Sequence, residues 1–326
     1  MRNFTFKGLL LTAVFMLLGC LSIQAANDDL ITKQITINLD KAGTLPNKIA
    51  SSEMYKITNL KIIGEINGTD WNMIREMAGR DNRGYGTEGK LSVLDLSEAK
   101  IVKGGDSYYP GDNCYTSNDE IGEKAFTDCS RLTSLTLPVG ITSIGYDAFA
   151  YCSGLTSLTL PAGITSIGEY AFSGCSGLTS LNLPAGITSI DKYAFSGCSR
   201  LTSLTLPAGI TSIGEFAFSY CSGLTSIYVY AEKVPRIGRY AFEGCASRKC
   251  TLYVPKGTYD NYRLSEFGYF ENIVEFDATG IDKTTTSTDV EEVSRYSLNG
   301  QRLAVPVKGL NIVKYSDGTV RKVVVK

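Results

Sequence analysis

The middle of this chain repeats itself every 23 residues, and this periodicity constrains the fold more than any other feature. The unit I-G-x-x-A-F-x-x-C-S-x-L-T-S-L-x-L-P-x-G-I-T-S occurs as five close copies and one looser copy, which begin at Ile121, Ile144, Ile167, Ile190, Ile213 and Ile237. One such unit cannot bury its apolar side chains alone, whereas stacked units bury them in a continuous core. The period therefore predicts an α/β solenoid in which each repeat forms one coil.

Within one unit, the order of side chains indicates a short strand followed by turns. Leu158 and Leu160 are expected to point inward because alternate residues of a strand face the same side. Pro161 ends the strand by removing a hydrogen-bond donor. The segment 168–175 is predicted to form one or two helical turns with Phe172 on the buried side.

The signature A-F-x-x-C-S-x-L-T-S-L-x-L-P resembles the BspA-like leucine-rich repeats of Bacteroidales-type bacteria over residues 121–276. Residues 254–259 and 270–274 resemble the way such arrays end. The resemblance implies a leucine-rich-repeat solenoid on a surface-exposed protein, because members of that family are typically exposed and some are adhesins. It implies no particular ligand, since one scaffold serves many partners.

Residues 1–26 have the composition of a secretory signal peptide, with a short basic head and an apolar run over residues 8–18. Two processing routes remain open. The letters L-L-G-C resemble a lipobox, in which Cys20 would become lipidated, whereas cleavage near Ala25 or Ala26 would release a soluble chain. Both routes predict an exported protein, either an outer-membrane lipoprotein at the cell surface or a secreted protein. Any membrane attachment is expected only through the lipid anchor.

Residues 27–120 are predicted to form an N-terminal cap and the first irregular repeats. Thr69 or Asp70 is expected to cap a short helix that runs through Met77. The segment 104–120 is expected to be a polar loop at the end of the solenoid. We interpret it as a tolerated insertion, with a binding loop as the alternative.

The composition changes after residue 276. Residues 277–292 are rich in Thr, Ser and acids, which is typical of a linker. Residues 293–326 carry the turn dipeptides Asn299-Gly300 and Asp317-Gly318 and are predicted to form a small all-β module. This module resembles the β tails that end many secreted Bacteroidales proteins, some of which are type IX sorting signals. It is shorter than a full sorting domain, so a plain β appendage is an equal alternative.

Composition argues against several function classes. With 32 basic and 33 acidic residues, the chain has no field that would attract nucleic acid. It also lacks histidine, which removes the usual base of a catalytic triad and the imidazole ligands of metals. We therefore expect no enzyme activity, no cofactor and no metal site. Calcium binding by a group of acids in segment 104–120 is a weak alternative; these are Asp106, Asp112, Asp119 and Glu120.

Cysteine recurs once per repeat, and we interpret this column as packing. The column contains Cys129, Cys152, Cys175, Cys198, Cys221 and, one residue late, Cys245. A single column has no tetrahedral grouping for zinc, and coils about 4.8 Å apart hold Cβ atoms too far apart for ordinary disulfides. The irregular pair Cys245 and Cys250 remains open as a disulfide.

The outward positions of the predicted strands form the candidate binding surface. One column contains Asp95, Thr136, Thr159, Asn182, Thr205, Tyr228 and Tyr253, and Tyr230 lies two residues beyond Tyr228. The neighbouring column contains Val93, Ser134, Ser157, Ser180, Ser203, Ser226 and Thr251. If the solenoid is a horseshoe, both columns line its concave face, with hydroxyl groups at the centre and tyrosines at the C-terminal end. The alternative is that small polar residues simply keep an exposed sheet soluble.

The sequence and the resemblance together predict a monomeric, non-enzymatic extracellular binding protein. An adhesin that recognises a host or cell-surface protein through the concave face is the first hypothesis. A surface protein that binds glycans, marked by its tyrosines, is the second. The third is a passive spacer, because near-identical repeats suggest selection for length.

Overall fold

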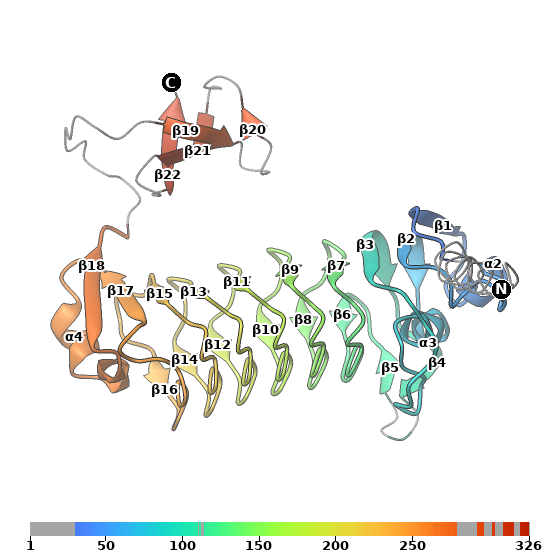
Figure 1. The fold of residues 1–326 in the computed structure, drawn as a ribbon, viewed down its shortest axis with the longest axis horizontal. Coiled ribbons are helices and arrows are strands. Elements are labelled where there is room, and N and C mark those ends of the chain that lie inside the picture. The colour runs from blue at the N-terminus through green and yellow to red at the C-terminus, as the bar shows by residue number, and fades with distance from the viewer. Residues whose placement is uncertain are drawn as a thin grey trace, which may run out of the picture.

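The computed structural model describes residues 30–109, 111, 114–278, 292–296, 302–303, 309–315 and 320–325. The expected signal peptide with Cys20, residues 279–291 of the expected linker, and the turns at Asn299 and Asp317 lie outside these ranges. In Figure 1 the coils of the array follow one another along a nearly straight axis. We therefore use the term strand face for the surface predicted to be concave.

Parallel strands from successive coils form two rows. The first row is made by β1 (Ile35–Leu39), β2 (Asn59–Ile66), β3 (Val93–Ile101), β7 (Ser134–Thr136) and β9 (Ser157–Thr159), and then by β11 (Ser180–Asn182), β13 (Ser203–Leu206), β15 (Ser226–Val229), β17 (Thr251–Pro255) and β18 (Asn272–Phe276). The second row is made by β6 (Glu120–Ile121), β8 (Ser143–Ile144), β10 (Ser166–Ile167), β12 (Ser189–Ile190), β14 (Ser212–Ile213) and β16 (Arg236–Ile237). Equivalent residues of successive units pair, as Leu135 does with Leu158. The predicted solenoid is confirmed. The outer surface of the first row is the strand face.

A continuous column of phenylalanine rings fills the core of the array. The rings of Phe126, Phe149, Phe172, Phe195, Phe218 and Phe242 stack with neighbouring centroids 5.0–5.5 Å apart and interplanar angles of 3–11°. Each ring therefore contacts the ring of the next coil in an offset stack, which aromatic pairs favour. The column joins neighbouring coils through their side chains as well as through their backbones.

The predicted helical turns at residues 168–175 are absent, and this part of the prediction is wrong. Tyr170 and Gly174 have left-handed backbones, with φ of 58° and 71°. Alternate amides of the segment donate to carbonyls of the following coil: Tyr170 to Lys192 at 3.0 Å, Phe172 to Ala194 at 2.7 Å, and Gly174 to Ser196 at 2.7 Å. An α-helix needs these amides for bonds within its own turn. Hydrogen bonding between coils therefore replaces hydrogen bonding within a helix.

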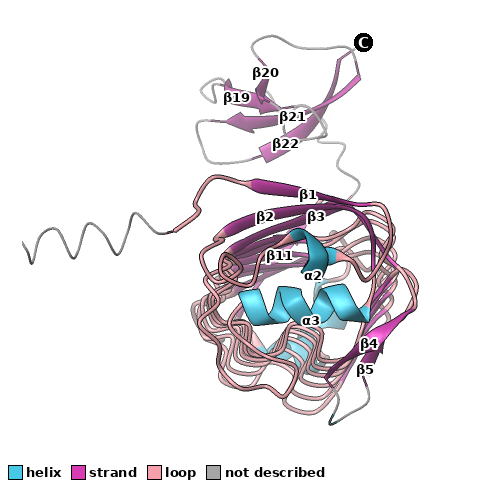
Figure 2. Ribbon diagram, turned by 90° about the vertical axis from the view of Figure 1, so that its right-hand side faces the viewer, coloured by secondary structure: helices cyan, strands magenta, loops and turns pink. Residues whose placement is uncertain are grey.

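Two short helices close the N-terminal end, α2 (Leu45–Lys48) and α3 (Gly68–Met77). Viewed along the axis, α3 lies across the end of the coils (Figure 2). The helix ends at Met77 as expected, but its N-cap is Asn67 rather than Thr69 or Asp70. The Asn67 side chain accepts from the Thr69 amide, while the buried Asp70 carboxylate accepts from the amides of Asn67 and Leu45. Asp70 thus completes a capping box from the third helical position.

The expected loop at residues 104–120 is instead a hairpin of β4 (Gly104–Tyr109) and β5 (Cys114–Thr116) that packs against α3. Its residue Tyr108 is only 1% exposed, and the hydroxyl group donates to the carbonyl of Glu123 at 2.8 Å. The Tyr108 ring also lies 6.2 Å from that of Trp71 on α3. The polar sequence suggested a loop, but the buried tyrosine makes the hairpin part of the cap.

The C-terminal end of the array is covered by α4 (Tyr259–Arg263) and the 3₁₀ helix η2 (Glu266–Tyr269). Phe267 and Phe270 pack on Phe242, the last ring of the core column, with centroids at 5.6 and 5.3 Å. Farther along the chain, four antiparallel strands form a separate sheet: β19 (Glu292–Tyr296), β20 (Arg302–Leu303), β21 (Gly309–Tyr315) and β22 (Val320–Val325). This sheet is the small β module that the sequence predicts.

Truncation of one core ring should be costly. Phe172 is fully buried between Phe149 and Phe195. We expect Phe172→Ala to lower the free energy of unfolding by about 3–5 kcal/mol, because it removes apolar burial and leaves a cavity. Urea denaturation followed by circular dichroism measures this. Val139→Ala, at a side chain that is 80% exposed, is the control and should stay within about 0.5 kcal/mol. Equal effects of the two variants would contradict a column that stabilises the stack.

Candidate functional site

The predicted column of outward residues lies in register on the strand face. In the first sheet, Lys61 pairs with Asp95, Asp95 with Thr136, and Thr136 with Thr159. In the second sheet, Asn182 pairs with Thr205, Thr205 with Tyr228, and Tyr228 with Tyr253. Thr136, Thr159 and Asn182 are exposed, and the other members are half-buried. Parallel pairing between the strands of successive coils therefore aligns each set along its sheet.

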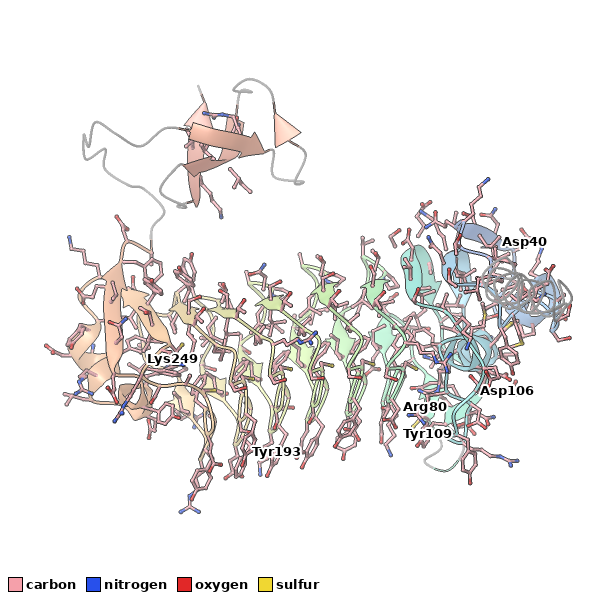
Figure 3. The ribbon with its side chains drawn as sticks, in the orientation of Figure 1. Asp40, Arg80, Asp106, Tyr109, Tyr193 and Lys249 are labelled. Atoms are coloured by element: carbon pink, nitrogen blue, oxygen red, sulfur yellow. The ribbon has the colours of Figure 1, made fainter. Side chains whose placement is uncertain are left out.

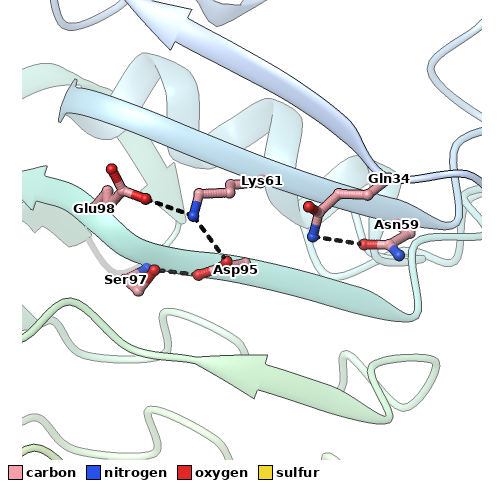
Figure 4. A network of polar contacts seen from close by, with 6 residues as sticks. All are labelled: Gln34, Asn59, Lys61, Asp95, Ser97 and Glu98. Carbon is pink, nitrogen blue, oxygen red and sulfur yellow. Dashed lines mark hydrogen bonds and ion pairs between the residues drawn. The ribbon is translucent and has the colours of Figure 1, made fainter.

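Asp95, at the N-terminal end of this column, is held in a polar network (Figure 4). Its carboxylate lies 3.4 Å from the Lys61 ammonium group and accepts from the Ser97 amide at 2.9 Å. The Lys61 ammonium group also lies 2.6 Å from the Glu98 carboxylate. Burial raises the pKa of Asp95, but the Ser97 hydrogen bonds and the Lys61 charge outweigh it and hold the pKa below its usual value. This carboxylate stabilises the first rungs and has little capacity left for a ligand.

A row of threonines beside the strands joins the coils, and the sequence alone did not reveal this role. Each hydroxyl group of Thr133, Thr156, Thr179, Thr202 and Thr225 donates to a backbone carbonyl of the preceding coil at 3.0–3.2 Å. These hydroxyl groups are committed to the stack. The exposed hydroxyl groups of Thr136 and Thr159 stand on the strand face itself, and they form its uncharged centre.

Four aromatic rings converge at the C-terminal end of the strand face. The Tyr228 and Tyr253 rings stack face to face, with centroids 4.4 Å apart and an interplanar angle of 5°. Phe276 meets Tyr228 and Tyr230 edge-on, at 6.0 and 5.1 Å. We call these four residues the strand-face cluster. Burial, together with the neighbouring Tyr253 hydroxyl group, raises the pKa of Tyr228, so this tyrosine stays uncharged at neutral pH.

The cluster contains the three tyrosines predicted from the sequence and one residue that the prediction missed. Phe276 belongs to β18, which lies beyond the last 23-residue unit and therefore outside the repeat pattern. The alternation along the strand could have indicated that Phe276 faces outward, since Val274 and Phe276 are spaced like the outward residues of the other strands. Val274 pairs with Tyr253 and is 40% exposed, so it extends the apolar surface.

The comparison with protein families identifies the array. Residues 119–249 match six copies of the BspA type leucine rich repeat region. The array is a BspA-type leucine-rich-repeat region. The match covers most of the segment whose sequence resembles these repeats, and the coils continue beyond it through β17 and β18.

Solved structures of bacterial leucine-rich-repeat proteins are similar to the chain. A T. pallidum protein is 32% identical over 40% of this chain and 59% of its own, with a TM-score of 0.38. A leucine rich cell surface protein from Faecalibacterium prausnitzii is 23% identical over 67% of this chain and 51% of its own, with a TM-score of 0.34. A protein from Bacteroides ovatus is 21% identical over 60% of this chain and 66% of its own, with a TM-score of 0.22. The chain thus spans about half to two thirds of the length of each.

No curated protein matches the chain. Within the described ranges, no helix combines the length and apolar character needed to cross a membrane.

The cysteines of the BspA-type array pack in its core. The cysteines of the column and Cys250 are buried thiols, so Cys245 and Cys250, which the sequence left open as a disulfide, are not bonded to each other. From Cys152 onward, each thiol of the column donates to a phenylalanine carbonyl of the preceding coil at 3.0–3.4 Å. Among the described residues, no group of three His, Cys, Asp or Glu side chains could hold a metal ion. Asp112, one of the acids considered for calcium, lies outside those residues.

A second aromatic surface, which we did not predict from the sequence, lies on the turns of the BspA-type array. Tyr146, Tyr170, Tyr193, Phe216 and Tyr240 form a row along the turns, with neighbouring centroids 4.7–5.8 Å apart. Tyr193 marks this edge in Figure 3, on the side of the solenoid away from the first row of strands. We call it the turn-edge row. The signal was present in the variable letters of the I-G-x-x-A-F segment, where aromatic residues recur.

The buried thiols should make the array sensitive to alkaline pH. Burial raises the pKa of Cys129 to about 11 and those of Cys175 and Cys250 to about 12, from an ordinary value of 9.0. Above pH 9 the unfolded chain releases these protons while the folded chain keeps them. The stability that the protonated thiols contribute is fully present below pH 9 and is lost as the pH rises from there toward their pKa in the folded chain. We expect a lower urea midpoint at pH 10.5 than at pH 8.0, measured with a reductant present.

Cys175→Ala is the matched variant for this test. It removes one thiol with a raised pKa. The fall in the urea midpoint between pH 8.0 and pH 10.5 should therefore be smaller in this variant, whatever its stability at pH 8.0. Identical midpoints for the parent protein at pH 8.0 and pH 10.5 would show that the thiols ionise equally in the folded and unfolded chains.

Proposed function

We propose that this protein is an exported, non-enzymatic adhesin that binds a host or cell-surface protein through its strand face. The observation that carries the proposal is the strand-face cluster. Its members Tyr228, Tyr230 and Tyr253 are partly exposed beside uncharged hydroxyl groups. Tyrosines gathered at one place on a surface are typical centres of protein–protein interfaces, where a few residues supply most of the affinity.

The packing within the cluster favours a protein partner over a sugar at this place. A sugar binds to aromatic residues mainly through an open ring face. Tyr228 and Tyr253 cover each other's faces, and Phe276 contacts Tyr228 and Tyr230 edge-on. The stack thus covers one face of each of these two rings, and their edges and hydroxyl groups suit the mixed apolar and polar contacts of a protein interface. Glycan binding at the cluster is therefore the second candidate, and a passive spacer is the third.

The chemistry of the strand face supports binding rather than catalysis. Its central hydroxyl groups carry no charge, and the carboxylate of Asp95 is engaged by Lys61 and Ser97. The thiols of Cys129, Cys175 and Cys250 are buried, and burial raises their pKa, so they are poor nucleophiles. A broad uncharged surface with one aromatic end is suited to recognising another surface.

The test is a binding screen of residues 27–326 against immobilised extracellular-matrix proteins and polysaccharides, by biolayer interferometry. We expect saturable binding to a protein. Tyr228→Ala/Tyr253→Ala should weaken this binding at least tenfold, as loss of a binding centre worth about 2 kcal/mol would.

The matched control is Tyr151→Ala/Tyr220→Ala, which removes two tyrosines that are each 59% exposed on the turns. It should leave protein binding unchanged. Glycan binding abolished by the strand-face variant would establish the second candidate in place of the first. A folded protein that binds nothing on either array would be a spacer.

A further inference from the structure

The turn-edge row ends on its C-terminal side at Tyr240, whose far side meets no further ring of the row. Tyr170 stacks on Tyr193 at 4.7 Å and Tyr193 on Phe216 at 4.9 Å, and the rings of Phe216 and Tyr240 meet at 5.1 Å with a tilt of 32°. The faces of the inner rings are covered by their neighbours. Tyr240 is the last member, and its side chain remains 57% exposed. The end of the row therefore presents an aromatic surface that its inner members do not.

A cavity of about 330 Å³ lies where the row ends. Its walls are Ile237, Gly238, Arg239, Tyr240, Ala241, Phe242, Glu243, Glu266 and Tyr269. These residues come from the last coil and from η2, and none comes from the preceding coils. The cavity is thus on the C-terminal side of Tyr240, opposite the side on which Phe216 packs. It occupies the position that the ring of a further coil would fill.

The walls of the cavity are held in place by the fold. The Gly238 amide donates to Ile213 at 2.7 Å, and the Arg239 carbonyl accepts from the Phe216 amide at 3.0 Å. On the other wall, the Tyr269 hydroxyl group donates to the Cys245 carbonyl at 2.9 Å, and its ring packs edge-on against Phe270. The backbone that leads to Tyr240 and the ring of Tyr269 are therefore fixed before any ligand arrives, which reduces the entropy lost on binding.

The charges around the cavity favour a neutral ligand that carries many hydroxyl groups. Arg239 supplies donors, and Glu243 and Glu266 supply acceptors. None of the three forms an ion pair with another residue that the structure describes. An anion would meet two carboxylates, and a cation would meet the guanidinium group. A neutral sugar can use both kinds of partner while its flat face stacks on Tyr240.

We propose that this cavity is a binding site for one neutral sugar unit, stacked on Tyr240 and hydrogen-bonded by Arg239, Glu243 and Glu266. Its volume is at the lower end for ligand pockets, which suits a single unit or the end of a glycan rather than a long chain. The site is separate from the strand-face cluster and does not depend on protein binding there. The protein would then carry a sugar site at its turn edge in addition to its strand face.

The experiment is isothermal titration calorimetry of the purified protein with maltohexaose, cellohexaose, mannohexaose, xylohexaose and a galactohexaose. We expect at least one to bind with a Kd at or below the millimolar range. Tyr240→Ala should weaken that binding at least tenfold, and Glu266→Gln should weaken it severalfold. Saturation-transfer NMR should place the strongest signals on the ring protons of one sugar face.

Tyr220→Ala is the matched control. Tyr220 is 59% exposed and has φ of 58°, against 57% and 57° for Tyr240, so alanine meets the same backbone strain at both positions. Its ring lies over Gly244 and does not line the cavity. The control should therefore retain sugar binding, as should Tyr228→Ala/Tyr253→Ala on the strand face.

Three outcomes would overturn the proposal. The first is that none of the five sugars binds to the folded protein at millimolar concentration. The second is that a sugar binds equally well to Tyr240→Ala. The third is that N-acetyl-tyrosine amide binds in place of sugars and is lost in Tyr240→Ala, which would make the cavity a site for an aromatic side chain of a protein. None of these results bears on the strand-face cluster, because its variants are separate.

Discussion

The distance between successive coils determines the rest of this structure. Hydrogen-bonded strands lie about 4.8 Å apart, and stacked aromatic rings also pack near this distance. Any side chain that recurs once in 23 residues therefore forms a continuous row at contact distance. Phenylalanine rings form such a row inside the array, threonine hydroxyl groups and cysteine thiols form hydrogen-bonded rows, and Tyr170, Tyr193 and Phe216 form one at the turns.

The same regularity explains which features the sequence could predict. The 23-residue period predicted the solenoid, the alignment of Thr136 with Thr159, and the packing role of the cysteines, because these depend only on equivalent positions in successive coils. It could not predict the turns, since the bonds that replace the helix link separate coils. The Asn67 cap and Phe276 were also missed, because both lie outside the period and depend on contacts with distant segments. The strand-face cluster was predicted only in part, because its tyrosines lie on strands that follow the repeat pattern and its phenylalanine does not.

The two aromatic surfaces differ in how much of each ring is free. In the strand-face cluster, Tyr228 and Tyr253 each cover one face of the other, and Phe276 meets Tyr228 edge-on. At the end of the turn-edge row, Tyr240 and Tyr269 border an open volume beside charged groups of both signs. One surface is suited to lie against another surface, whereas the other can enclose a small ligand. Both are at the C-terminal end, where the repeat loses its regularity.

The separation of near-identical central coils from specialised ends has a consequence for how such a protein can change in length. Insertion or deletion of one 23-residue unit adds or removes a coil whose two sides match its neighbours. The N-terminal cap with Asp70 and the C-terminal cap with Phe267 would keep their contacts, because each touches only the coils next to it. The distance between the two ends would change by about 4.8 Å at each step. The length of the array can therefore change in whole units of one coil. The surfaces at its C-terminal end would change their distance from the N-terminal cap but keep their own structure.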